Sequence, residues 1–172
     1  METDTASCIK NHIKSVQRKL SVLIKELQNR LENHDRSKLE DELWYWEFMD
    51  QEPKYPYGSK EYFSKIKRNK MVFKMHYKKN RHHPEHFMNG INDMNLIDIM
   101  EMLCDWISYK DDISITDAVE VIEKQSRRFG FSDELKNILL NTLFEYFAKL
   151  RIPSEEHSVL MLNEEKEIPM AL

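Results

Sequence analysis

Residues 96–107 read LIDIMEMLCDWI, and this stretch decides the fold class. Its apolar residues recur at helical spacing and leave a single stripe of charge, which is typical of a central helix rather than a surface helix. Asn95 comes directly before it and can cap the first turn. We therefore predict a central helix from Leu96 to about Tyr109.

Three carboxylates share one side of this predicted helix. Asp98, Glu101 and Asp105 lie at positions i, i+3 and i+7. A solvated stripe is the commoner explanation of such a pattern, but a central helix has little free solvent face. Because an unpaired buried carboxylate is costly, we expect cations to meet the stripe, either metal ions or the histidines that precede it.

Histidine is concentrated just before this helix. Four of the seven histidines fall within eleven residues: His76, His82, His83 and His86. Arg81 adds a planar cation that suits bidentate contact with phosphate, and Asn80 stands four residues after His76. A loop that titrates at the surface is one interpretation of this cluster. We favour a functional site, because His, Arg and Glu gather around one proline, Pro84.

An earlier motif pairs His34 with Asp35. A neutral imidazole and a carboxylate side by side can reach one divalent metal ion, although such a dipeptide also occurs by chance. Lys38 lies one turn beyond Asp35 and could bind a phosphate held by that ion. Ser37-Lys38-Leu39-Glu40 also has the pattern of a capping box, which predicts a helix from there to about Met49.

The rest of the chain has helical periodicity with few breaks. We predict further helices at 6–28, 59–79, 114–128 and 132–150, with Ser59, Ser114 and Ser132 as caps and Gly130 as a left-handed terminator. Three glycines and five prolines are few for 172 residues, which favours helices over sheets. We predict an all-α protein: a single compact helical bundle over 1–152, with a loosely docked tail at 153–172.

Composition limits the classes of protein further. The hydrophobic share of 41% is enough for one modest core. Cys8 and Cys104 are too few for a disulfide framework or a four-cysteine zinc site. Uncharged runs are too short to span a bilayer, and the N-terminus lacks the features of a secretory signal. We expect a soluble cytoplasmic protein with no membrane contact.

Charge is arranged in blocks. Residues 54–84 hold ten Lys and Arg against one acid, and residues 85–123 hold ten acids against one base. The basic block contains several aromatic residues, so it could bind nucleic acid through phosphate contacts and stacking. The wet face of an amphipathic helix explains it more simply. The net charge of −4 also counts against nucleic acid, which we consider an unlikely partner.

The order of these motifs resembles the HD-domain metal-dependent phosphohydrolases. An early His is followed by a His-Asp pair, further histidines and a late Asp in an all-helical chain. The stretches HIKSVQ, NHDRSKLEDE, NRHHPEHF, EMLCDW and RRFGFSDEL are similar to an uncharacterised HD-like family of bacteria and bacteriophages, over roughly residues 9 to 145. The resemblance implies an HD-like helical fold and the hydrolysis of phosphate esters.

The resemblance also implies a ligand set. By position, the metal ligands would be His12, His34, Asp35 and Asp105, with His76, His82 and His83 available for further metal ions. In this pattern Lys38 would help hold substrate phosphate, whereas Met75 stands where a histidine is expected. On one unbroken helix His12 would lie ~33 Å from His34, so it can be a ligand only if the chain bends, most plausibly around Gln28-Asn29.

The leading hypothesis is therefore a metal-dependent phosphohydrolase acting on a nucleotide or a similar small phosphorylated compound. The divalent ion would be Mn, Mg, Fe, Co, Ni or Zn, and Asp35, Lys38 and Glu101 would take part in catalysis, with Glu101 or Asp98 orienting or deprotonating water. The expected substrate contacts are Lys38, Asn80, Arg81, His86 and Tyr57. A catalytically silent protein that binds or sequesters nucleotides is the alternative, and a homo-oligomer is left open.

Overall fold

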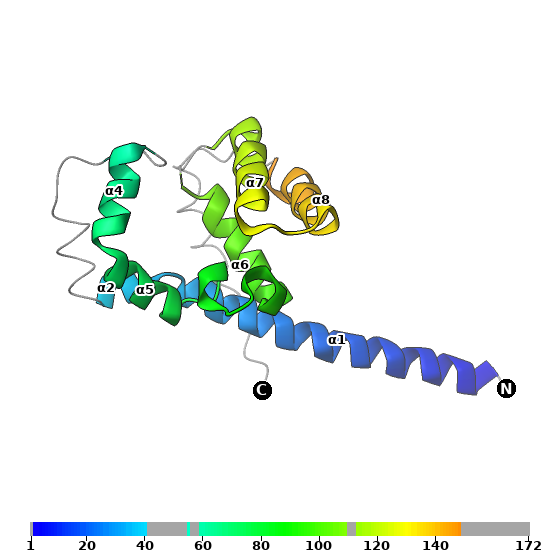
Figure 1. Cartoon of the computed structure of the whole chain (residues 1–172). Coiled ribbons are helices and arrows are strands. Elements are labelled where there is room, and N and C mark those ends of the chain that lie inside the picture. The colour runs from blue at the N-terminus through cyan, green and yellow to red at the C-terminus, as the bar shows by residue number, and fades with distance from the viewer. Residues whose placement is uncertain (1, 41–54, 56–58, 110–112, 149–172) are drawn as a thin grey trace, which may run out of the picture. The chain divides into compact units, whose positions relative to one another are not determined.

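A computed structural model describes residues 2–40, 55, 59–109 and 113–148. These residues form helices and contain no strand, which confirms the all-α prediction (Figure 1). The chain divides into two compact units, Met1–Asp105 and Trp106–Leu172, and we describe each by itself. The predicted tail at 153–172 lies outside the described residues, and the single-domain bundle stays a prediction.

The first unit consists mainly of helices. In chain order they are α1 (Glu2–Asn33), α2 (Arg36–Glu40), α4 (Lys60–Arg68), α5 (Lys70–Lys79), the 3₁₀ turns η2 (Pro84–His86) and η3 (Gly90–Asp93), and most of α6 (Leu96–Ile107). The long blue helix in Figure 1 is α1. It runs without interruption through 28–29, where a bend was needed to bring His12 to the site.

Two local predictions in this unit are wrong. Ser37 lies inside α2 and not before it, so the proposed capping box is absent. The turn between α1 and α2 is made instead by Asp35, which has a positive φ of 52°. The helix predicted over 59–79 is divided at Asn69, which leaves the helical conformation with φ −98° and ψ 27°. The Ser59 cap itself is confirmed, because its Oγ accepts the Tyr62 amide at 3.1 Å.

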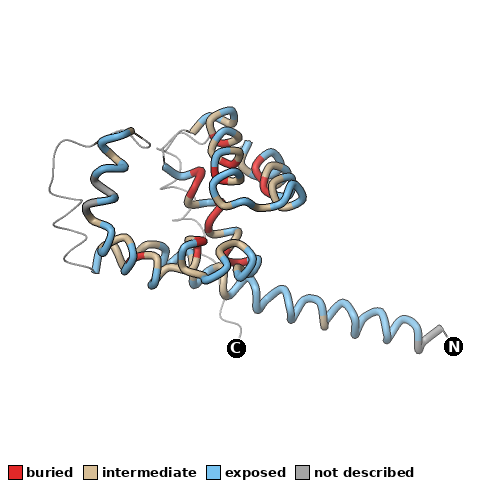
Figure 2. The backbone as a smooth tube through the Cα atoms, viewed as in Figure 1, coloured by how far each residue is buried: buried red, intermediate tan, exposed pale blue. Residues whose placement is uncertain are grey.

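The start of α6 agrees with the prediction. The side-chain oxygen of Asn95 accepts the amides of Ile97 and Asp98 at 2.9 and 3.0 Å, which satisfies two free donors of the first turn. Further along α6, Met102 and Leu103 are buried. Figure 2 colours the buried parts of the chain red. The apolar side of α6 is therefore core, as a central helix requires.

The second unit contains α7 (Ile115–Phe129), α8 (Asp133–Thr142) and a short π-helix, η4 (Leu143–Phe147). The predicted caps are confirmed: Ser114 accepts the Asp117 amide at 3.0 Å, Ser132 accepts the Leu135 amide at 3.3 Å, and Gly130 has φ 64°. The unit buries small and aliphatic side chains, namely Ala118, Ile122, Leu139 and Leu143. Of the helices within the described residues, none has both the length and the apolar character needed to cross a bilayer.

Candidate metal centre

The predicted His-Asp pair lies in the sharp turn between α1 and α2. The left-handed backbone of Asp35 is a conformation that Asp and Asn adopt more readily than most residues. It lets the Lys38 amide donate to the Asp35 carbonyl at 2.8 Å. The Lys38 ammonium also contacts the Asp35 carboxylate. The turn therefore presents the carboxylate of Asp35 next to His34, with a positive charge beside it.

Four side chains from three parts of the first unit converge on this turn. The group is His34, Asp35, His82 and Asp105, whose ligand atoms all lie within 4.8 Å of one another. The Nε2 atom of His34 is 3.6 Å from a carboxylate oxygen of Asp35 and 3.6 Å from one of Asp105. The Nε2 atom of His82 is 3.4 Å from the other oxygen of Asp35. Two imidazoles and two carboxylates could hold a divalent ion.

A second group shares two members with the first. It consists of Asp35, His76, His82 and His83. The Nε2 atoms of His76 and His83 are 2.8 Å apart, and that of His76 is 3.3 Å from Asp35. Since one imidazole nitrogen can serve one ion at a time, His82 belongs to either group, whereas the two oxygens of Asp35 can serve both.

Glu101 lies behind the first group. One of its oxygens, Oε1, accepts from Nδ1 of His34 at 2.9 Å and from Nδ1 of His82 at 3.0 Å. Its other oxygen accepts from Arg30 at 2.7 Å. Both histidines are thereby fixed with Nε2 directed toward Asp35. Such a carboxylate behind a metal-binding imidazole is a recurrent feature of metal sites.

Asp98 forms a further layer and is fully buried. It accepts two hydrogen bonds from Arg81, at 3.0 and 2.8 Å, and one from Arg30 at 3.1 Å. The Asn95 amide adds another at 3.1 Å. The stripe of carboxylates on α6 is thus met by cations as expected, but at Asp98 these cations are arginines rather than histidines or a metal ion.

The other side of the centre carries neutral partners. Nδ1 of His76 lies 3.2 Å from Oγ of Ser37 and 2.9 Å from the amide nitrogen of Asn80. The same amide nitrogen donates to Oγ of Ser37 at 2.7 Å. Asn80 therefore supports a histidine.

The environments separate the pKa values of the four histidines. The Asp105 carboxylate, followed by that of Glu101, raises the pKa of His34 to about 10. Burial alone would lower the pKa of His82, but the nearby carboxylates of Asp35 and Glu101 raise it. Burial lowers the pKa of His76 to about 4 and that of His83 to about 3.

The carboxylates of the centre are ionised. Burial acts to raise the pKa of Asp35, yet the neighbouring His82 and Lys38 side chains hold it well below its usual range. Burial likewise opposes the lowered pKa of Glu101, which hydrogen bonds from His34 and His82 bring down. At neutral pH the centre thus combines ionised oxygen donors with the neutral imidazoles of His76 and His83, the forms that bind metal.

Two buried atoms of the centre test whether a cation fits there. Oδ1 of Asp35 and Nε2 of His82 face each other, and neither has a hydrogen-bond partner among the described residues. Buried polar atoms are normally satisfied, because leaving one unpaired costs roughly 1–3 kcal/mol. A divalent ion would satisfy an imidazole lone pair and a carboxylate oxygen together, so the donor set fits a metal ion.

Comparison with known families gives the chain a family but no activity. Residues 1–145 match the model of a family of unknown function, DUF5662. The chain belongs to this family. The matched range includes every residue of the two groups that could hold a metal ion in this DUF5662 protein. No curated protein and no solved structure matches the chain.

Most predicted ligands meet in this DUF5662 structure. The six that converge are His34, Asp35, His76, His82, His83 and Asp105. His12 does not join them, because it is exposed on the unbroken α1, ~33 Å along that helix axis from His34. The bend that would have brought it closer is absent.

Other predicted roles also change. Glu101 holds two histidines and an arginine, so its placement does not support a role in deprotonating water. Nδ1 of His86 donates to the Tyr77 carbonyl at 2.9 Å and so ties η2 to α5 instead of facing the ligands. Tyr57 lies outside the described residues. Arg30 was missed, since its partners are 68 and 71 residues away in the sequence.

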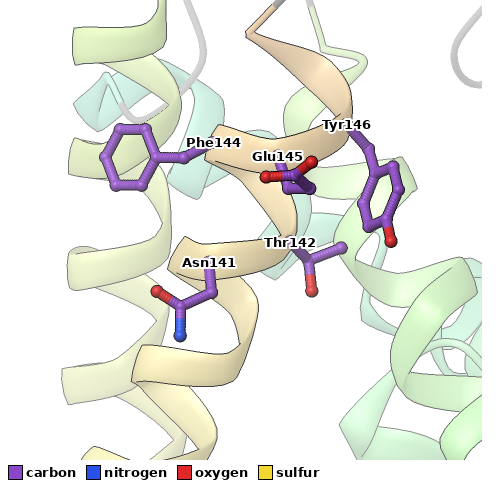
Figure 3. A pocket seen from close by; sticks show the side chains of 5 residues that line it. All are labelled: Asn141, Thr142, Phe144, Glu145 and Tyr146. Atoms are coloured by element: carbon purple, nitrogen blue, oxygen red, sulfur yellow. The ribbon is translucent and has the colours of Figure 1, made fainter.

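A surface pocket in the second unit has a different character. Figure 3 shows the side chains that line it, which are Asn141, Thr142, Phe144, Glu145 and Tyr146. These residues include no histidine and a single carboxylate. The pocket therefore has neither the donors nor the charge of the candidate metal centre.

Proposed function

We propose that this DUF5662 protein is a metal-dependent phosphohydrolase acting on a nucleotide or a similar small phosphorylated compound. The observation that carries the proposal is the pair of facing, unsatisfied atoms on Asp35 and His82, inside a group of two histidines and two aspartates. The resemblance to HD-domain phosphohydrolases supports the same reaction class. The ion is Mn²⁺, Mg²⁺, Fe²⁺, Co²⁺, Ni²⁺ or Zn²⁺.

In the proposed reaction the metal ion and the side chains of the protein have different roles. His34, Asp35, His82 and Asp105 would hold the divalent ion, which when bound would supply Lewis-acid chemistry for activating water and polarising a phosphoryl oxygen. Lys38 stands beside Asp35 and would offset phosphate charge. Arg81 keeps 42% of its side chain exposed although it binds Asp98, so it remains our candidate for a second phosphate contact.

The test is a turnover assay on metal-stripped protein resupplied with Mn²⁺, Mg²⁺, Co²⁺ or Fe²⁺. Mono-, di-, tri- and cyclic nucleotides are incubated with it and resolved by HPLC. The matched variant is Asp35→Asn, because Asn also tolerates the left-handed backbone while it removes the charge. Asp133→Asn is the control, since Asp133 is 86% exposed at the start of α8.

We expect a product that requires metal, is lost in Asp35→Asn and persists in Asp133→Asn. Product that forms equally well in Asp35→Asn would exclude this ligand set. A nucleotide that stays bound and is recovered unchanged would replace turnover with sequestration. A rise in melting temperature with Mn²⁺ in the wild type, absent in Asp35→Asn, would show metal binding independently of turnover.

A further inference from the structure

We propose that Arg30 is a positioning residue of the metal centre, acting through Glu101 on both His34 and His82. The inference rests on the proposed function, because it assumes that these histidines hold a metal ion. It adds a residue of α1 that is not a ligand and whose side chain binds Glu26, Glu101 and Asp98 rather than any of the six converging ligands.

The first step is that one oxygen orients two ligands. Oε1 of Glu101 accepts from Nδ1 of His34 at 2.9 Å and of His82 at 3.0 Å. With one proton kept on each Nδ1, an ion that displaces the proton of Nε2 meets a lone pair on that atom, which is the form of the ring that binds metal. Because both rings depend on the same atom, any displacement of Glu101 moves both imidazoles together.

The second step is that the orientation of the Glu101 carboxylate must be fixed by another side chain. The terminal torsion of a glutamate is broad and gives little orientation by itself. Arg30 donates to its second oxygen at 2.7 Å and thereby fixes the plane of the carboxylate. The side chains of Arg30 and Glu101 are only 17% and 10% exposed, so water competes weakly for this contact.

The third step is that Arg30 is itself fixed on three sides. Its guanidinium donates to Asp98 at 3.1 Å and to Glu26 at 2.9 Å, besides Glu101. A rigid planar fork with several donors suits such a bridge, whereas a lysine ammonium could not reproduce all three directions. Arg30 thus links α1 to two carboxylates of α6, one structural and one behind the ligands.

A variant of Asp98 distinguishes a positioning role of Arg30 from a general effect on the stability of the fold. Its carboxylate binds Arg30, Arg81 and the Asn95 amide rather than His34 or His82. Asp98→Asn should therefore lower stability and leave the Arg30–Glu101 contact in place. Arg30→Met removes that contact. If Arg30 only stabilised the fold, the two variants would affect metal binding alike.

The experiment titrates Co²⁺ into metal-stripped wild type, Arg30→Met, Arg30→Lys and Asp98→Asn. Affinity is measured by calorimetry, and the visible absorption of bound Co²⁺ reports ligand geometry. We expect Arg30→Met to weaken Co²⁺ binding about 10- to 100-fold, as is typical of outer-shell changes, and to alter the spectrum. Arg30→Lys should recover part of the affinity. Asp98→Asn should stay within about threefold of the wild type, well below that outer-shell range.

Wild-type affinity and spectrum in Arg30→Met would overturn the inference while the metal centre stands. Failure of the wild type to bind Co²⁺ would overturn the metal centre and the inference with it. Should Arg30→Met not fold, the near-isosteric Glu101→Gln tests the same step, because it removes the charge that attracts Arg30 and both histidines. Unchanged Co²⁺ affinity in Glu101→Gln would equally exclude the positioning role.

Discussion

The two pairs of histidines in the centre differ although they converge on the same carboxylate. His34 and His82 have raised pKa values, while His76 and His83 have pKa values of about 4 and 3. One member of each pair lies equally close to Asp35, because Nε2 of His76 is 3.3 Å and Nε2 of His82 is 3.4 Å from the same carboxylate oxygen. The difference therefore does not come from distance.

The partners behind the rings account for the difference. Glu101 accepts from both rings of the first pair and stabilises their protonated forms. His76 instead has Ser37 and Asn80 behind it, which are neutral, so burial dominates. Outer-shell chemistry thus divides four histidines into two held by an ionised carboxylate and two that are uncharged without metal.

The largest effect should separate His82 from His83. His82 is buried, belongs to both ligand groups and is held by Glu101, whereas His83 belongs to one group. We expect His82→Ala to reduce Co²⁺ affinity by more than the about 100-fold upper range of an outer-shell change. His83→Ala should lose distinctly less. Calorimetric titration of both variants measures this.

His86→Ala serves as the control, because His86 binds a backbone carbonyl outside the two groups. It should bind Co²⁺ as the wild type does. Equal losses in His82→Ala and His83→Ala would remove the distinction between the pairs and indicate that the centre acts as one undivided cluster.

A smaller effect tests the layer behind the first pair. Asp98→Asn removes the charge that pairs with Arg81 and Arg30, and we expect the free energy of unfolding to fall by about 2–3 kcal/mol, the range for hydrogen bonds to charged groups. The melting temperature should fall by roughly 4–12 °C. Chemical denaturation at pH 7 measures the loss.

The effect of Asp98→Asn on the free energy of unfolding should depend on pH. Burial acts to raise the pKa of Asp98, but hydrogen bonds from Arg81, Asn95 and Arg30 lower it below the ordinary value. A lowered pKa in the folded state stabilises the protein above the unfolded-state value, near 4, and this stabilisation is lost as the pH falls through the folded-state value. The difference between wild type and Asp98→Asn should thus persist at pH 5 and shrink toward pH 2. A constant difference would contradict the ion pairs.

The sequence predicts correctly those features, such as helix caps, that depend only on residues nearby in the chain. Asn95, Ser114 and Ser132 were recognised as caps because a cap needs only the next three residues. The capping box at Ser37 failed for a tertiary reason: its hydroxyl engages Asn80, 43 residues away. The break between α4 and α5 at Asn69 could not be predicted, because no glycine or proline lies there.

The parts of the candidate site that could be predicted are those whose residue types have few chemical roles. Residues of common types with many roles could not be predicted. Histidines and aspartates have few roles when clustered, so six of the seven predicted ligands meet. His12 was the exception, because only the geometry of an unbroken α1 excludes it. Arg30 gave no signal among the other basic residues, since its partners stand 68 and 71 residues away. The requirement that a buried carboxylate meet a cation pointed to its existence but not to its position.

The smallest effect concerns the second histidine pair. Ser37→Ala removes the hydroxyl that accepts from Asn80 at 2.7 Å and lies 3.2 Å from His76. The loss of these two neutral hydrogen bonds should lower the free energy of unfolding by about 1–2 kcal/mol. Co²⁺ affinity should fall by less than the about tenfold lower bound of typical outer-shell changes, because Ser37 supports a histidine outside the Glu101 pair. Ser21→Ala, on the exposed part of α1, is the control and should change neither quantity. A loss of Co²⁺ affinity in Ser37→Ala as large as that in Arg30→Met would contradict this expectation. It would mean that the neutral partners of His76 position that ring as firmly as Glu101 positions His34 and His82. The two histidine pairs would then differ in charge alone.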